Sequence, residues 1–176
     1  MVNNKYSVVS LFAGCGGLDL GFTGGFKFLN KKYSKRNFDI SWANDFNEAA
    51  CLTFQKNFGH DIVCGDIRKV LNGTNNKLFD KPLPLKADIV LGGFPCQDFS
   101  HAGKRKGFNS LRGNLYQSMA EVVRRTKPLL FVAENVKGLM TMDKGEAVKI
   151  IIKDFENLGY YVKFEVLLAA NYGVPQ

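Results

Sequence analysis

A short run of branched apolar residues, Ile89 to Leu91, places the strongest constraint on the fold. The run lacks the alternation of a half-exposed strand, so it is typical of a strand that is buried on both faces of a parallel sheet. Further apolar runs are separated by segments with helical periodicity. The sequence therefore predicts an α/β domain that is doubly wound around a mostly parallel sheet, and its 176 residues allow one such domain.

Residue patterns locate the expected elements along the chain. Strands are expected at residues 6–12, 40–44, 61–64, 89–91, 129–133 and 160–170, with 129–133 fully buried. Helices are expected at 47–58, 115–126 and 143–158, the last beginning with a capping box of Asp143 and Glu146. The basic segment 27–39 has no periodicity and is expected to be a solvated loop.

Charge and cysteine usage narrow the class of protein. The net charge of +8 favours a polyanionic partner such as nucleic acid, although many basic proteins have none. The four cysteines lack C-x-x-C spacing, which argues against a metal site or a disulfide framework and predicts a reducing, cytoplasmic setting. No apolar run approaches the length of a membrane span, and the amino terminus lacks a signal-peptide core.

Cys96 follows the 89–91 strand in the stretch GGFPCQDFS and is the candidate nucleophile. Gly92 and Gly93 allow a sharp turn and Pro95 restricts the backbone before the thiol. A reactive thiolate also needs nearby positive charge, which follows at Lys104, Arg105, Lys106 and Arg112. The alternative is that Cys96 is a small buried apolar residue.

Other polar or glycine-rich positions follow the remaining strands. A glycine-rich turn, Asp45 and Asp66 come after the first three strands, where a parallel sheet binds nucleotide-like ligands. Together, these three features could bind a sugar and an adenine-like base. The alternative is that the glycine stretch is only a tight turn and that Asp45 only caps the following helix. Glu134 and Asn135 follow the 129–133 strand, and a carboxylate beside an amide could hydrogen-bond to the amidine-like edge of a base. The alternative is that Glu134 makes its hydrogen bonds within the protein and has no ligand.

The stretch 99–112 combines glycines with four basic residues. Glycines at both ends could act as hinges, so an active-site lid that contacts phosphates is one interpretation and a solvated basic loop is the other. His101 within it is interpreted as incidental rather than as a general base.

Seven stretches, in order, resemble motifs of the DNA (cytosine-5)-methyltransferases, especially the prokaryotic restriction-modification type. They are SLFAGCGGLDLGF, NDF, GDI, GGFPCQDFS, RGNLY, ENVKGL and NYGVPQ. The resemblance covers essentially the whole chain and implies a Rossmann-like fold, incomplete at its carboxyl end, that binds S-adenosyl-L-methionine.

The resemblance also implies roles for individual residues. Asp45 would hold the ribose, and Phe46 and Ile67 would lie on either side of the adenine ring. Asp66 would accept a hydrogen bond from the adenine amino group. The cofactor-binding set would be Phe12, Gly14, Gly16, Gly17, Leu18, Asp45, Phe46, Asp66, Ile67, Pro95 and Leu115.

The same resemblance implies the reaction. Cys96 would add to carbon 6 of cytosine. Glu134, if burial raises its pKa, would be protonated and would support the addition by hydrogen-bonding to N3, and Asn135 would help to orient Glu134 and the base. The base would be flipped out of double-stranded DNA, with the 97–112 lid closing behind it. The DNA contacts would come from Gln97, Ser100, Lys104, Arg105, Lys106 and Arg112.

The match stops at Gln176, whereas family members continue into an Arg-x-Arg motif, a further core strand and a target-recognition domain. Residues 1–176 are therefore expected to be a partial catalytic domain that needs a complementary polypeptide. The 160–170 strand would lack its neighbour and leave an apolar, aggregation-prone edge. The alternatives are an RNA cytosine-5 methyltransferase and a non-catalytic cofactor- or DNA-binding fragment. A thiol hydrolase is remote, because His60 and His101 are the only histidines and neither is well placed beside Cys96.

Overall fold

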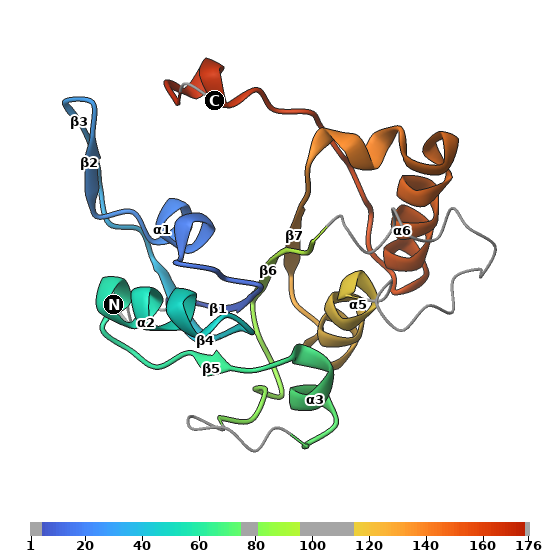
Figure 1. The fold of residues 1–176 in the computed structure, drawn as a ribbon, viewed down its shortest axis with the longest axis horizontal. Helices are drawn as coiled ribbons and strands as arrows, with labels where there is room; N and C mark the ends of the chain where they lie inside the picture. The colour runs from blue at the N-terminus through green and yellow to red at the C-terminus, as the bar shows by residue number, and fades with distance from the viewer. Residues whose placement is uncertain (1–4, 75–80, 96–114, 175–176) are drawn as a thin grey trace.

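The fold is a five-stranded parallel sheet with helices on both faces (Figure 1). The computed structural model describes residues 5–74, 81–95 and 115–174. The strands lie in the order β5-β4-β1-β6-β7 and all pair in parallel. Their bounds are β1 (Tyr6–Leu11), β4 (Phe38–Asp45), β5 (Val63–Cys64), β6 (Ile89–Gly93) and β7 (Leu130–Glu134). The predicted α/β class and the first five expected strands are confirmed, with shifts of a few residues at their ends.

The helices divide between the two faces of the sheet (Figure 1). Neighbouring residues of β1 point to opposite faces, since Val8 packs with Phe54 of α2 whereas Val9 packs with Met119 of α5. Figure 1 shows α1 and α2 on one side and α3, α5 and α6 on the other. The bounds are α1 (Gly17–Thr23), α2 (Glu48–Phe58), α3 (Ile67–Leu71), α5 (Leu115–Thr126) and α6 (Glu146–Asn157). None of the helices in the described part of the chain is long and apolar enough to cross a membrane.

The expectation of a loop at 27–39 is wrong, because part of this segment forms a β-hairpin. It comprises β2 (Phe26–Phe28) and β3 (Lys31–Tyr33), which are antiparallel. Leu29 and Asn30 form the two-residue connection with positive φ angles of 45° and 60°, as a primed hairpin turn requires. The rings of Phe26 and Tyr33 stack across the strands at 4.7 Å. The aromatic pair stabilises a segment whose composition indicated only a charged surface.

The carboxyl end departs most from expectation. The expected strand at 160–170 is absent, and the expected burial of 129–133 is wrong, since Leu129 and Leu130 are 76% and 49% exposed. β7 pairs with β6 along one edge and with no strand along the other among the described residues, so that outer edge is unpaired there. The short helices η1 (Lys137–Met140), η2 (Met142–Gly145) and η3 (Ala169–Tyr172) complete this region.

The predicted capping box before α6 is also wrong. Asp143 and Lys144 adopt left-handed backbone conformations within η2, and α6 begins after Gly145 without a side-chain cap. Asp143 therefore lies two residues before Gly145, which occupies the N-cap position.

Candidate active site

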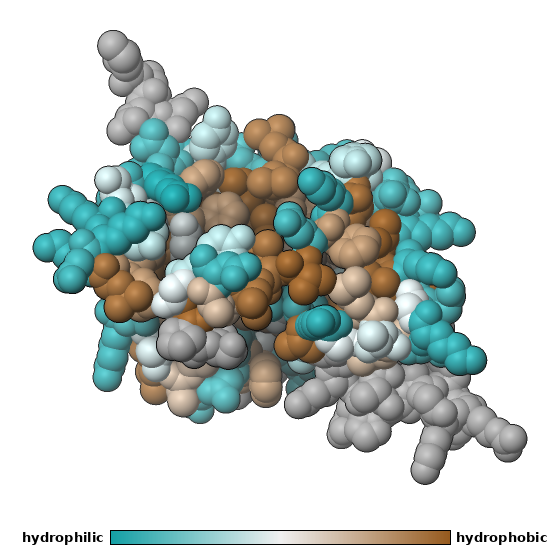
Figure 2. Space-filling model, turned by 90° about the horizontal axis from the view of Figure 1, so that it is seen from above, coloured by the Kyte–Doolittle hydropathy of each residue, from teal (hydrophilic) through white to brown (hydrophobic). Residues whose placement is uncertain are grey.

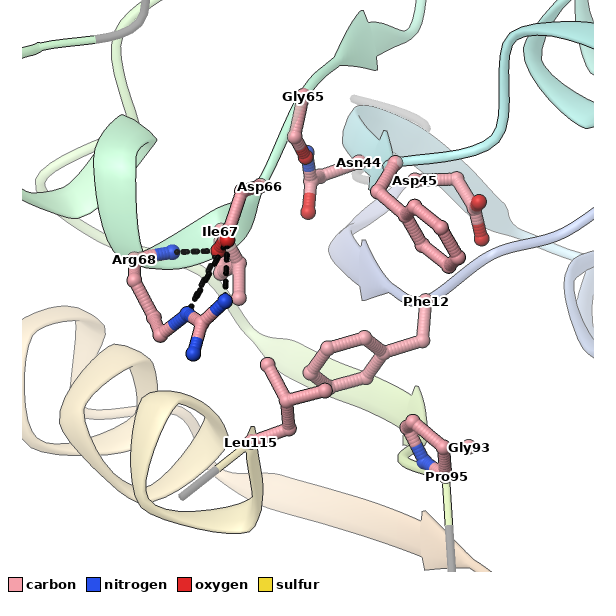
Figure 3. A pocket seen from close by; sticks show the side chains of 11 residues that line it. Phe12, Asn44, Asp45, Gly65, Asp66, Ile67, Arg68, Gly93, Pro95 and Leu115 are labelled. Atoms are coloured by element: carbon pink, nitrogen blue, oxygen red, sulfur yellow. Dashed lines mark hydrogen bonds and ion pairs between the residues drawn. The ribbon is translucent and has the colours of Figure 1, made fainter. Parts of the chain in front are cut away.

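A pocket of about 350 Å³ opens at the carboxyl ends of β1, β4, β5 and β6, next to the start of α5 (Figure 3). In a parallel sheet this edge is the usual place for ligands, because every strand delivers its following loop there. The lining residues are Phe12, Asn44, Asp45, Phe46, Gly65, Asp66, Ile67, Arg68, Gly93, Pro95 and Leu115.

The glycine-rich turn after β1 is tied to the end of β4 by Asp45. One Asp45 carboxylate oxygen accepts a 2.8 Å hydrogen bond from Gly14 N, and the other accepts one of 2.8 Å from Asn47 N. Asn47, not Asp45, caps α2, since its side chain accepts from Ala50 N. Asp45 is 8% exposed, and each carboxylate oxygen retains a lone pair that could accept from a ligand hydroxyl.

Gly16 does not line the pocket, but it packs against the Phe58 ring of α2. Its φ is +91°, and a Cβ at this position would lie 2.1 Å from the Phe58 ring of α2. A Cβ at Gly17, in contrast, would have no atom within 4 Å. The turn thus needs a glycine at position 16 so that its backbone can lie close to the Phe58 ring of α2.

Two polar side chains, those of Asn44 and Asp66, organise the β4–β5 side of the pocket. The Asn44 amide donates 2.8 and 2.9 Å hydrogen bonds to the carbonyls of Val63 and Gly65, joining the end of β4 to the β5–α3 turn. Asp66 then caps α3 by accepting from Arg68 N at 2.9 Å, and its carboxylate also binds the Arg68 guanidinium (Figure 3). The hydrogen bonds from the Arg68 side chain lower the pKa of Asp66, so this carboxylate stays ionised.

The apolar walls come from separate elements. Phe46 is 73% exposed at the mouth, whereas Ile67 is 2% exposed at the base of α3. Figure 3 shows the Phe12 ring pointing toward Leu115. Flat apolar surfaces flanked by two carboxylates suit a ligand that combines an aromatic ring with a sugar.

A second cavity, of about 370 Å³, contains Glu134 at the end of β7. It shares Phe12 and Gly93 with the first pocket, so the two cavities adjoin. A Cβ on Gly93 would lie 3.0 Å from Glu134 Oε2, so the glycine lets the carboxylate lie close to β6. The residue is exposed, so the burial that was the condition for a protonated Glu134 is not found.

Asn135 links the ends of β6 and β7. Its amide Nδ2 donates a 2.7 Å hydrogen bond to the carbonyl of Phe94, and its Oδ1 accepts from Val136 N at 2.9 Å. The bond to Phe94 fixes the backbone just before Pro95, which precedes Cys96 in the sequence.

Several predicted residues lie outside the described residues. They are Cys96, Gln97, Ser100, Lys104, Arg105, Lys106 and Arg112. Of the cysteines that are described, Cys51 is no competing nucleophile, since burial, together with its neighbour Cys64, raises its pKa to about 12.

The structure brings seven of the predicted cofactor residues around the first pocket: Phe12, Asp45, Phe46, Asp66, Ile67, Pro95 and Leu115. Leu18 lines the second cavity, and Gly14, Gly16 and Gly17 line neither. Sequence reasoning missed Asn44, Gly65, Arg68 and Gly93 as lining residues. Asn44 could have been predicted as a lining residue from its position at the end of an apolar strand. No feature of the sequence indicated that Arg68 would line the pocket.

Comparison with solved structures assigns the fold. A protein described as a DNA modification methyltransferase from an Escherichia coli prophage superposes with a TM-score of 0.59 at 26% identity, over 87% of this chain and 38% of its own. The methyltransferase EhMeth of Entamoeba histolytica gives a TM-score of 0.61 at 21% identity, over 97% of this chain and 49% of its own. The sheet is therefore the Rossmann-like sheet of a methyltransferase fold.

Residues 6–176 match the family of C-5 cytosine-specific DNA methylases, and the chain belongs to that family. It is 48% identical to the type II methyltransferase M.NgoFVII of Neisseria gonorrhoeae over 99% of this chain, and 38% identical to M.FnuDI of Fusobacterium nucleatum over 96%. The chain spans 42% and 43% of the lengths of these two relatives.

Proposed function

We propose that this chain is the S-adenosylmethionine-binding part of a type II enzyme that methylates carbon 5 of cytosine in double-stranded DNA. The observation that carries the proposal is the pair of adjoining cavities at the carboxyl end of the sheet, which share Phe12 and Gly93. One has the walls and acceptors for a nucleoside, and the other contains the carboxylate of Glu134. A methyl group would pass between ligands held in the two.

The first pocket fits S-adenosylmethionine, which would supply an electrophilic methyl group. Asp45 would accept from the ribose hydroxyls through the lone pairs left by Gly14 and Asn47. Phe46 and Ile67 would enclose the adenine, with Asp66 at its amine edge. The whole stretch 1–176 is thus proposed as one catalytic unit.

Cytosine carbon 5 is too electron-poor to attack a methyl sulfonium unaided, and a nucleophile on carbon 6 removes this obstacle. We assign that role to the Cys96 thiolate, which forms a bond to carbon 6 as charge moves toward N3. Glu134, in its protonated form, would donate a proton or a hydrogen bond to N3. The hydrogen bond from Asn135 to the Phe94 carbonyl, which joins the ends of β6 and β7, would support its position. Carbon 5 would then form a bond to the methyl group as the bond between that methyl and the sulfonium sulfur breaks. Loss of the carbon-5 proton and elimination of Cys96 would restore the ring and the thiolate.

The target cytosine would have to leave the duplex, since carbons 5 and 6 lie within the stack. Gln97, Ser100, Lys104, Arg105, Lys106 and Arg112 are proposed to contact the DNA. Duplex affinity would then decrease steeply with salt.

A complementary polypeptide, or further chain, is proposed to complete the enzyme. A groove of about 690 Å³ runs between β7, α6 and residues 159–164. Exposed apolar side chains surround it, including Leu130, Tyr161 and Phe164 at 49, 91 and 55%. Figure 2 shows hydrophobic residues gathered across the middle of one face. A strand added along the open edge of β7 would bury part of this surface.

Covalent trapping tests the chemistry. The chain is mixed with S-adenosylmethionine and duplex containing 5-fluorocytosine, with and without a candidate complementary polypeptide. A denaturation-resistant adduct is expected, lost in Cys96→Ser and kept in Cys15→Ser, which removes an exposed thiol. An adduct on transfer RNA but not on the duplex would favour the RNA alternative. Cofactor binding without any adduct would favour the non-catalytic fragment.

A further inference from the structure

The β2–β3 hairpin is a strongly basic projection that the proposed mechanism does not use. Between Gly24 and Asn37 the sequence holds five cations and no carboxylate: Lys27, Lys31, Lys32, Lys35 and Arg36. All five are exposed, and none forms an ion pair within the described part of the chain. The unpaired positive charge is thus available to an external anion.

The register of the hairpin sets two of these cations directly against each other. Lys27 pairs with Lys32, while Phe26 pairs with Tyr33 and Phe28 with Lys31. Because side chains alternate along a strand, Lys27 and Lys32 share one face, opposite the stacked Phe26 and Tyr33 rings. Like charges in directly opposed positions destabilise a two-stranded ribbon, which is marginal to begin with. A bound anion between the two ammonium groups would remove this repulsion.

The hairpin is held in place at its base. Gly25 N donates to the Tyr33 carbonyl and Arg36 N to that of Thr23, both at 2.9 Å. At the tip, Leu29 is 71% exposed. Fixing the base limits the conformational entropy that the hairpin lysines lose when they bind a ligand.

The location of the hairpin suits a ligand that also reaches the active site. Figure 1 shows it projecting toward the side of the molecule to which β6 and β7 run, beyond α1. Figure 2, which views that side, shows hydrophilic side chains projecting from the end where the hairpin lies. Extended DNA could contact both regions, whereas a small anion would contact only one.

We propose that Lys27 and Lys32 form a clamp for the phosphate backbone of duplex DNA, separate from the contacts assigned to the 97–112 segment. The proposal rests on the proposed function for the identity of the polyanion. The clamp adds affinity without base specificity, since it offers two ammonium groups and no group that reads base edges.

The test measures the affinity of the 176-residue chain for a fluorescent 24-base-pair duplex by polarisation over a range of salt concentrations. In Lys27→Gln/Lys32→Gln, we expect affinity at low salt to drop by about tenfold or more, and the slope of log K against log salt to shrink by about 1.8, at roughly 0.9 per phosphate contact. Lys27→Arg/Lys32→Arg keeps both charges and is expected to restore the slope. Lys56→Gln/Lys153→Gln removes the same charge from α2 and α6 and is expected to leave the slope unchanged.

The possible results distinguish a failure of the Lys27–Lys32 clamp from a failure of the proposed function. If the unmodified chain binds DNA but the glutamine variant at 27 and 32 keeps its slope, the clamp is wrong and the proposed function stands. If the control variant loses as much slope, the effect is overall charge and the clamp is also wrong. If the unmodified chain binds anionic phosphatidylserine vesicles in preference to the duplex, DNA is the wrong partner. If it binds S-adenosylmethionine and no duplex, both the clamp and the DNA substrate are contradicted.

Discussion

The side-chain amide of Asn135 donates a 2.7 Å hydrogen bond to the main-chain carbonyl of Phe94. This bond joins the ends of β6 and β7, the two strands that lead to Cys96 and to Glu134. The proposed nucleophile follows β6 in the sequence and the Glu134 carboxylate ends β7, so such a link between the strand ends affects their relative position.

Asn135→Ala is expected to reduce methyl transfer by about 100-fold, since a misplacement of around 1 Å between reacting groups has an effect of that size. Cofactor affinity is expected to change less than twofold, because Asn135 does not line the first pocket. Single-turnover transfer in the complemented enzyme and equilibrium dialysis measure the two quantities. Asn157→Ala, at the exposed end of α6, is the control. Equal losses of affinity and rate would show that the bond does not act on the reacting groups.

Phe46→Ala is expected to weaken S-adenosylmethionine binding roughly five- to tenfold without lowering stability, because the ring is 73% exposed and lines the pocket. Leu52→Ala removes another exposed apolar side chain, 55% exposed on α2 and outside the pocket. Calorimetric titration with the cofactor compares them. Unchanged binding in Phe46→Ala would remove this residue from the cofactor site.

Gly16→Ala is expected to lower the free energy of unfolding by about 2–4 kcal/mol, since left-handed strain and displacement of the Phe58 ring add together. Gly17→Ala, where a Cβ has open space, is expected to stay within about 0.5 kcal/mol of the parent chain. Denaturant unfolding followed by circular dichroism measures both. Similar losses in the two variants would contradict the close packing of the turn against α2.

Asp19 predicts a pH-dependent effect on stability. The residue is fully buried in α1, neither carboxylate oxygen has a hydrogen-bond partner among the described residues, and burial raises its pKa above 3.8. A raised folded-state pKa means that the unfolded state releases the proton more readily, so stability decreases as pH rises from 3.8 through the raised value. We therefore expect Asp19→Asn to unfold at higher denaturant concentration than the parent chain at pH 8, and the difference to shrink near pH 4. A difference that is constant with pH would contradict this assignment.

Leu130→Lys is expected to reduce aggregation of the isolated chain, because a charge on the open β7 edge opposes strand addition. Leu85→Lys introduces the same charge at a residue that is 90% exposed in a connection away from that edge. Light scattering over time compares the variants. The Leu130 variant is also expected to lose complementation by a second polypeptide. Equal solubility gains in both variants would assign the effect to net charge instead of the edge.

Local pattern was sufficient for much of the fold. Apolar runs predicted β1, β4 and β6, and the 3.6-residue period predicted α2 and α5, because burial on two faces or one face leaves a periodic signature. The positions of Asp45 and Asp66 after strands also predicted their meeting at one edge, since parallel strands bring their carboxyl ends together.

Other features depended on contacts that no local pattern encodes. The hairpin was missed because its stability comes from one aromatic pair and a turn without the usual Asn-Gly signal. Arg68 entered the pocket wall through its pairing with Asp66, which requires the turn into α3.

By its own residues, the sequence determined the strands of the parallel sheet, the helices α2 and α5, and which strand ends carry acids, amides and glycines. Only the tertiary structure decided which of these groups meet, how Asn135 joins two loops, and that β7 stays open along one side. The physical reason is that backbone preference and periodicity are local, whereas the burial of a side chain such as Leu130 depends on which other elements pack beside its strand.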